Sequence, residues 1–145
     1  MSNALFDLGR EGFLAGEIDW DTAVIKSALV RGYTPNLATH KFVSDVTGAG
    51  GTLVATSAAM SAKTVTLGVA DAADVTFSAV ASGAAIPYVL VFQASAVTGG
   101  GDVAASAQRV IALIDSSTGV ALPVTPNGGD ITVSWDSGAN RIFKL

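Results

Sequence analysis

Three acidic side chains near the start of the chain are the first candidates for chemistry. Glu17, Asp19 and Asp21 alternate with Ile18 and Trp20, so on an extended chain all three carboxylates lie on one face. Clustered carboxylates can hold Ca²⁺, but this ion takes six to eight oxygen ligands, and three carboxylates do not fill that shell. We therefore interpret the segment as a solvated face opposite a buried Ile18 and Trp20, and we predict no metal site.

The other residue patterns of catalysis are incomplete. His40 is the only histidine, and no Gly-x-Ser-x-Gly motif accompanies it, so a Ser-His-Asp triad is not supported. The glycine-rich stretches 48–51 and 99–101 match neither the phosphate-binding loop nor the dinucleotide fingerprint. The chain has no cysteine, which excludes thiolate metal sites and disulfides. We predict that the protein is not an enzyme and binds no cofactor.

The composition indicates one folded domain, 1–145, with few charges. Half of the 145 residues are hydrophobic, 14% are charged, and the net charge is −4. So few charges exclude a solvated disordered chain, and the acidic balance argues against a nucleic-acid partner. The longest apolar run, 84–92, is interrupted by Pro87 and is too short to cross a membrane. No signal peptide is recognisable in the first residues, so we expect a protein made without export.

The low charge has two interpretations. One is a small β domain whose core is built from small side chains such as alanine and valine. The other is a surface that is itself covered by neighbours in an assembly, because a monomer with so few charges would be poorly soluble. We favour the assembly.

A short helix is expected at the start of the chain. Residues 3–15 carry apolar side chains at roughly helical spacing, with Asn3 as the N-cap and Gly16 as the stop. Gly9 and Gly12 weaken this helix by about 1 kcal/mol each relative to alanine. We therefore expect it to form only when docked, either on the domain's own sheet or on a partner.

Strands are expected from residue 19 onward, separated by turns rich in glycine, asparagine and aspartate. The expected strands are 24–30, 52–56, 63–69, 74–80, 86–94, 109–115, 130–135 and 141–145. The segment 35–46 is either a helical turn or an irregular crossing. Asn127-Gly128 is a strong hairpin signal. This spacing predicts an all-β, antiparallel β-sandwich with a jelly-roll-like topology and one short N-terminal helix.

Both ends of the chain resemble small virion structural proteins of tailed bacteriophages. The likeness is clearest over residues 3–20, 122–136 and 142–145. It implies a non-enzymatic protein of the virion, for which we favour capsid cement or decoration, on the capsid surface. The partners implied are the major capsid protein and further copies of this chain, as a dimer or trimer at symmetry axes. Such a protein is made in the cytoplasm of the bacterial host.

Two segments are the candidate contacts with those partners. One is the N-terminal helix or arm, 1–16, and the other is the flexible Gly/Ala-rich loop 96–106. This loop is either a floppy hairpin loop or a loop that orders only against a partner. The residues expected to make contact are Leu5, Phe6, Phe13, Gly99, Gly100 and Gly101.

Two other functions remain open at this point. A tail or baseplate component would share the same composition. A carbohydrate- or receptor-binding module would need exposed aromatic side chains and polar pockets. Trp135 is in register with Ile131 and Val133, so we expect its indole in the core instead.

Overall fold

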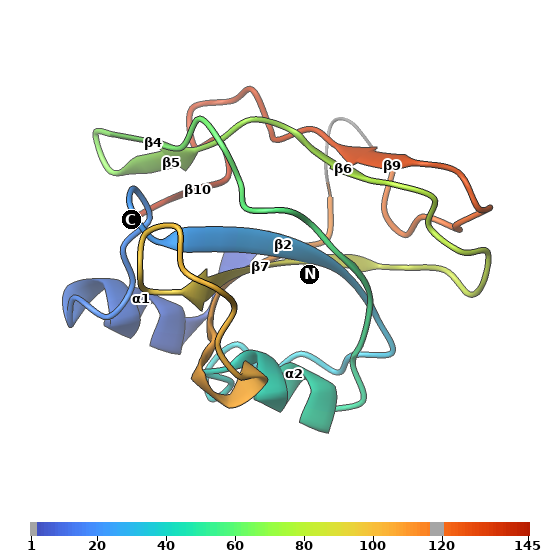
Figure 1. The fold of residues 1–145 in the computed structure, drawn as a ribbon, viewed down its shortest axis with the longest axis horizontal. Coiled ribbons are helices and arrows are strands. Elements are labelled where there is room, and N and C mark those ends of the chain that lie inside the picture. Colours follow the sequence, from blue (N-terminus) through green and yellow to red (C-terminus); the bar gives the residue numbers. More distant parts are fainter. Residues whose placement is uncertain (1–2, 117–120) are drawn as a thin grey trace.

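A computed structural model describes residues 3–116 and 121–145 of the chain. A five-stranded sheet forms the middle layer, with smaller sheets over one face and helices on the opposite side (Figure 1). The strands are β1 (Ala4–Leu5), β2 (Val24–Arg31), β3 (Thr52–Thr56), β4 (Thr64–Thr66), β5 (Val69–Asp71), β6 (Val75–Phe77), β7 (Tyr88–Ser95), β8 (Arg109–Ile114), β9 (Ile131–Val133) and β10 (Phe143–Lys144). The helices are α1 (Asp7–Leu14), α2 (Val43–Gly48) and the 3₁₀ turn η1 (Ala105–Ala107).

The central sheet has the order β1-β8-β7-β2-β3, and every neighbouring pair in it is antiparallel. Its inner strands are buried on both faces, because successive side chains of a strand point to opposite sides. In β2, Ile25 and Leu29 join the core beneath the small sheets, whereas Ala28 and Val30 join the core on the helix side. The long apolar runs of β2, β7 and β8 are therefore explained by two cores that share one sheet.

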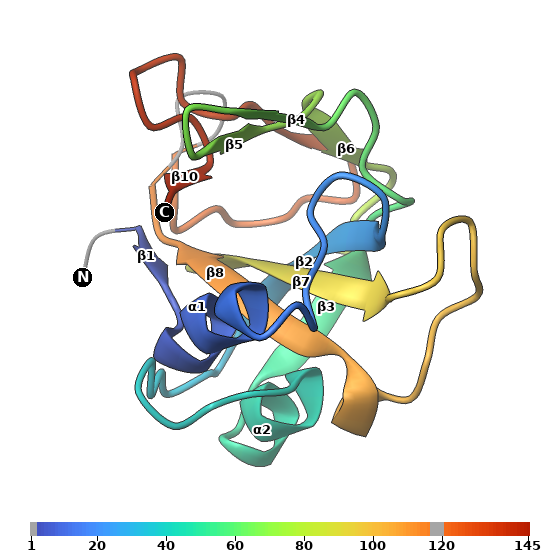
Figure 2. The ribbon, with the colours of Figure 1, turned by 90° about the vertical axis from the view of Figure 1, so that its left-hand side faces the viewer.

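The outer edge of β8 is closed by two segments that are distant in sequence (Figure 2). Leu113 pairs with Ala4 of β1, and the N–H of Phe6 donates to the carbonyl of Ile111. Further along, the N–H of Val110 donates to the carbonyl of Lys41. Together they occupy backbone groups that would otherwise be open to strand addition.

Helix α1 packs against the backbone of β8, and two glycines allow this close approach. A Cβ on Gly9 would lie 2.9 Å from the carbonyl oxygen of Val110. A Cβ on Gly12 would lie 2.6 Å from Cδ1 of Ile18 and 2.7 Å from Nη2 of Arg109. Arg109 is buried there and donates to the carbonyl of Leu8. The helix thus docks on the domain's own sheet, one of the two placements expected.

The expected helix over 3–15 is too long at its start. Residues 4 and 5 are a strand, and the helix begins at Asp7. Asn3 does not cap it; the Asn3 Oδ1 accepts hydrogen bonds from the N–H groups of Asp115 and Ser116, beyond the end of β8. The expected stop is confirmed, since the helix ends before Gly16, whose φ is +73°. At Ala4 and Leu5, pairing with β8 therefore outweighs the helical spacing of the apolar side chains.

The ambiguous segment 35–46 contains the start of α2. A turn closed by the His40 N–H on the Asn36 carbonyl comes first, and the helix follows from Val43. One carboxylate oxygen of Asp45 accepts the N–H groups of Lys41 and Phe42, at 2.8 and 2.9 Å. This capping holds the start of α2, and the two hydrogen bonds keep the pKa of Asp45 below its ordinary value.

The second layer consists of small sheets, β10-β5-β4 and β6-β9. The expected single strand over 63–69 is wrong, because the chain reverses at Leu67 and Gly68, which both have positive φ (53° and 77°). Asn127-Gly128 does form a turn, but it does not join neighbouring strands: β9 pairs with β6, and the N–H of Gly128 donates to the carbonyl of Val80. The fold is all-β and antiparallel with few helices, and a jelly-roll topology is not confirmed.

The close approach of α1 to β8 leads to a prediction about helical glycines. Gly9→Ala improves helix propensity, yet we expect it to lower the free energy of unfolding by roughly 1–3 kcal/mol, because its Cβ would press on the backbone carbonyl oxygens of Val110 and Ile111, which cannot move aside as a side-chain end can. Gly48→Ala in α2 is the matched control. Its Cβ meets nothing within 4 Å, so we expect a gain of about 0.5 kcal/mol. Equal effects of the two variants in chemical denaturation would contradict tight docking.

Candidate functional site

The acidic residues near the start of the chain stabilise a turn. One oxygen of Asp19 accepts the N–H groups of Asp21 and Thr22, and the other accepts the Thr22 hydroxyl at 2.7 Å. Hydrogen bonds from Thr22 keep the pKa of Asp19 below its ordinary value. Ile18 and Trp20 are buried as predicted, although the segment is a turn and not a strand. Across residues 3–116 and 121–145, no group of three or more metal-ligating side chains is placed to hold an ion.

His40 is part of a structural contact with a tyrosine. The hydroxyl of Tyr33 lies 2.6 Å from Nδ1 of His40, and the Tyr33 ring packs edge-on against Tyr88. Burial raises the pKa of Tyr33, so this hydroxyl stays protonated and can donate to the histidine. Tyr33 and His40 both lie in the loop after β2, and the contact of Tyr33 with Tyr88 holds this loop against the start of β7.

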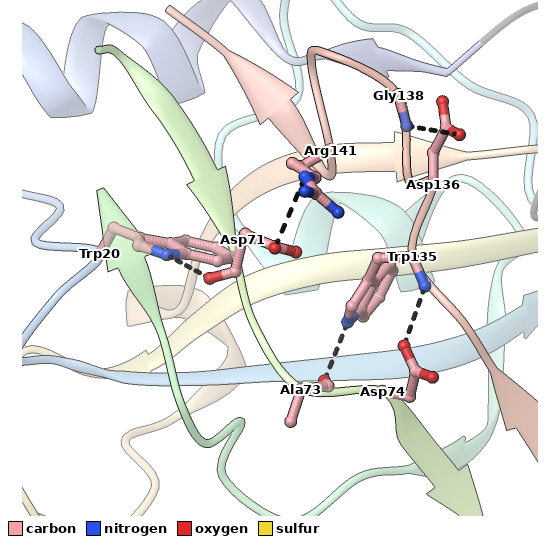
Figure 3. A network of polar contacts seen from close by, with 8 residues as sticks. All are labelled: Trp20, Asp71, Ala73, Asp74, Trp135, Asp136, Gly138 and Arg141. Carbon is pink, nitrogen blue, oxygen red and sulfur yellow. Dashed lines mark hydrogen bonds and ion pairs between the residues drawn. The ribbon is translucent and has the colours of Figure 1, made fainter. Parts of the chain in front are cut away.

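Both tryptophans point inward, and their indole groups hold the second layer together (Figure 3). The indole N–H of Trp20 donates to the carbonyl of Asp71, and that of Trp135 donates to the carbonyl of Ala73. The backbone N–H of Trp135 also donates to the Asp74 carboxylate. Trp135 is therefore in the core as predicted, and neither indole forms an exposed platform for a sugar.

The expected contact residues of the N-terminal segment lie mainly inside the domain. Leu5 belongs to the core beneath the small sheets, and Phe6 is fully buried on the helix side. A partner could reach these two side chains only if β1 detached from β8. Phe13 is different: it is half-buried, and its ring centroid lies 5.6 Å from that of Phe143.

The loop that carries Gly99, Gly100 and Gly101 projects from the end of β7. Its far side is attached to the sheet twice: Lys26 forms an ion pair with Asp102 at 2.9 Å, and the N–H of Val103 donates to the carbonyl of Ala94. A Cβ added to Gly99 or Gly101 would meet no atom within 4 Å, so the tip of this loop is open to a neighbour.

One apolar surface feature was not foreseen from the sequence. We call it the apolar end face, made of the exposed side chains Val65, Leu67 and Leu145, which are 58%, 90% and 57% exposed. Beside them is a groove of about 410 Å³. Its apolar lining includes Phe13, Ile18, Trp20, Val65, Val69 and Phe143.

The backbone at this face is also unusual. Leu67 has a φ of +53°, a conformation that disfavours an L side chain by about 1 kcal/mol or more and that asparagine and glycine tolerate best. A leucine that is strained and almost fully exposed contributes little to folding. The alternation of Val65, Leu67 and Val69 suggests one buried strand face, and only the observed reversal at Leu67-Gly68 shows that Leu67 is at a turn.

The charges beside the groove are few and partly compensated. Asp19 and Asp21 lie at its edge. Both attract the ammonium group of Lys63, which donates to the carbonyl of Ala23, while burial lowers the pKa of Lys63. Exposed apolar side chains beside a groove mark this face as a candidate contact surface.

The burial of Phe6 yields a direct test against an exposed neighbour. We expect Phe6→Ala to lower the free energy of unfolding by roughly 3–5 kcal/mol, because it leaves a cavity in the helix-side core. Leu14→Ala, in the same segment, is the control, since Leu14 is 90% exposed and its loss should leave stability unchanged. Similar midpoints in chemical denaturation for both variants would show that the segment is not anchored by Phe6.

The two capping aspartates predict how stability depends on pH. Asp19 and Asp45 both have a pKa below the ordinary value of 3.8. Their contribution is therefore fully present above that value and is lost as the pH falls through the lower, folded-state pKa. We expect the denaturation midpoint of the wild-type protein to fall more steeply in this acid range than that of the Asp19→Asn, Asp45→Asn double variant. Parallel acid curves would contradict this assignment.

Comparisons with known proteins do not identify a family for this chain. The chain matched no protein-family model, no curated protein and no solved structure. None of the helices in the described part of the chain is long and apolar enough to cross a membrane.

Proposed function

We propose that this chain is a structural protein of a tailed-phage virion, and specifically a cement or decoration protein that binds and stabilises the lattice of the major capsid protein. The observation that carries the proposal is that the two ends of the chain, which both resemble virion structural proteins, lie next to each other. The ring of Phe143 lies 5.6 Å from Phe13 and packs edge-on against Trp20 at 5.2 Å. Both ends that resemble virion proteins therefore border the same groove.

The shape of the domain suits a protein that binds a repeated lattice. Its sheet is buried on both faces, so the body is stiff and can present a surface without first ordering it. A weak contact between each copy and the shell then suffices, because copies that are linked to one another bind with an avidity well above the affinity of a single contact. The apolar end face and the tip of the 96–106 loop are the surfaces that this role would use.

The proposal includes the partners and the location. The partners are the major capsid protein and neighbouring copies of this chain, and the location is the outer surface of the capsid. A tail or baseplate component remains the alternative, and copy number distinguishes the two. A cement protein covers equivalent sites over the whole shell, whereas a tail component occupies a small number of positions.

Fractionation of the virion tests this function. Virions of the phage that encodes the chain are dissociated, and heads and tails are separated on a density gradient. Quantitative peptide mass spectrometry then measures the chain against the major capsid protein in the same fraction. We expect it in the head fraction, at a copy number comparable with that of the major capsid protein. A few copies, or a chain found only in tails, would show that the cement role is wrong.

A further inference from the structure

The turn before β9 holds the one asparagine of the chain that precedes a glycine, Asn127. The residues of this turn, 127–130, are all exposed. Asparagine is a chemically labile residue, and a following glycine has no side chain to hinder its own backbone nitrogen. The asparagines elsewhere in the chain precede alanine, leucine and arginine. The Asn127 side-chain amide is therefore the one most open to attack by the next backbone nitrogen.

Two hydrogen bonds of the turn act on this reaction in opposite directions. The Asn127 Oδ1 accepts the N–H of Gly129 at 3.0 Å, an Asx turn that holds the side-chain amide against the backbone and polarises its carbonyl. The Gly128 N–H, which belongs to the attacking nitrogen, donates to the carbonyl of Val80 at 2.9 Å. The amide is thus prepared for attack, while the nitrogen that would attack it is engaged elsewhere.

The contact with Val80 continues the small sheet β6-β9 beyond its last paired residues. The N–H of Ala79 donates to the Asp130 carboxylate at 2.8 Å, and the N–H of Val80 donates to the carbonyl of Gly129 at 3.0 Å. Val80 itself is buried in the core beneath the small sheets. The Gly128 N–H can therefore leave Val80 only when this end of the sheet opens.

The surroundings of the peptide bond are accessible to water. A Cβ added to Gly128 would meet no atom of the described chain within 4 Å. Once the hydrogen bond to Val80 is broken, water and hydroxide can reach both the Gly128 nitrogen and the Asn127 side chain.

We propose that Asn127 is a site of spontaneous deamidation, and that the pairing of Gly128 with Val80 sets its rate. When the turn opens, the Gly128 nitrogen loses its proton to hydroxide and attacks Cγ of Asn127. The bond from Cγ to Nδ2 then breaks, and the side-chain nitrogen takes a proton from water and leaves as ammonia, which regenerates the hydroxide. One water opens the resulting succinimide ring at either carbonyl and gives aspartate or isoaspartate at position 127. The inference does not depend on the virion role, because the reaction is intramolecular.

The two products differ in their effect on the fold. Isoaspartate routes the main chain through the former side chain and adds one carbon atom to it before Gly128. The Gly128 N–H and the Gly129 carbonyl then no longer match Val80, so the end of the β6-β9 sheet loosens. Aspartate leaves the backbone unchanged and keeps an oxygen that accepts the Gly129 N–H.

Peptide mass spectrometry of the full chain, incubated at mildly alkaline pH with and without guanidinium chloride, tests the site. Deamidation increases the peptide mass, and chromatography separates the aspartate form from the isoaspartate form. We expect modification of Asn127 in both samples, at least about tenfold slower in the native protein, because the Gly128 N–H is held there. Asn140 is the internal control: it is also exposed but precedes Arg141, and it should stay intact over the same time.

Two exposed aspartates test whether the turn controls the rate. Asp130→Ala removes the acceptor of the Ala79 N–H, so it should speed native-state deamidation of Asn127 at least about threefold. Asp136→Ala is the matched control, because Asp136 accepts the N–H of Gly138 in a different turn, and the rate at Asn127 should be unchanged.

The purified isoaspartate form gives a readout of the fold. We expect it to unfold at a lower denaturant concentration than the wild type, since its lengthened main chain no longer fits Val80. Asn127→Asp, which changes only the charge, should unfold at the same concentration as the wild type.

Three outcomes would overturn the inference. The first is an Asn127 that stays unmodified in the denatured chain, which would mean that it is not a deamidation site. The second is an equal rate in the native and the denatured chain. The third is an Asp130→Ala variant that deamidates no faster than Asp136→Ala. None of these results bears on the copy number in virion heads, so failure here and failure of the cement role are distinguishable.

Discussion

The architecture depends on one constraint: the inner strands of the main sheet are apolar on both faces. β7 and β8 are buried along almost their whole length, so neither face can be left to water. Each face therefore needs a cover of its own. Two small sheets, tied by the indoles of Trp20 and Trp135, cover one face, and the helices with the Tyr33 loop cover the other.

The edges of the two sheets differ in whether other segments cover them. The outer edge of β8 is closed by β1, by Phe6 and by the segment before α2, and the glycines of α1 let the helix pack against the same strand. The edge of β4 is not covered by another strand of the described part of the chain. This edge is only three residues long, which by itself limits the pairing that it offers to another strand.

Burial changes along the N-terminal segment. Phe6 and Leu5 are expected partner contacts that the structure places in the cores, where they hold the domain together. Phe13, further along the same segment, lines the groove and contacts Phe143. The same short segment thus contributes its first residues to folding and its last residues to the surface.

Local pattern was enough to predict most strands and the all-β class, because burial on a pleated strand leaves a period-two signature. It also predicted the burial of Ile18 and Trp20, although these two residues lie in a turn and not in the expected strand. It was not enough at three places. Residues 4 and 5 have helical spacing but pair with β8, a partner more than 100 residues away. Asn127-Gly128 forms a turn between strands that are not neighbours. Leu67 continues an apolar alternation across a reversal that its residue type disfavours. The apolar end face follows from that reversal, and so only the tertiary structure revealed it: long-range pairing decides which apolar side chains are buried and which remain exposed.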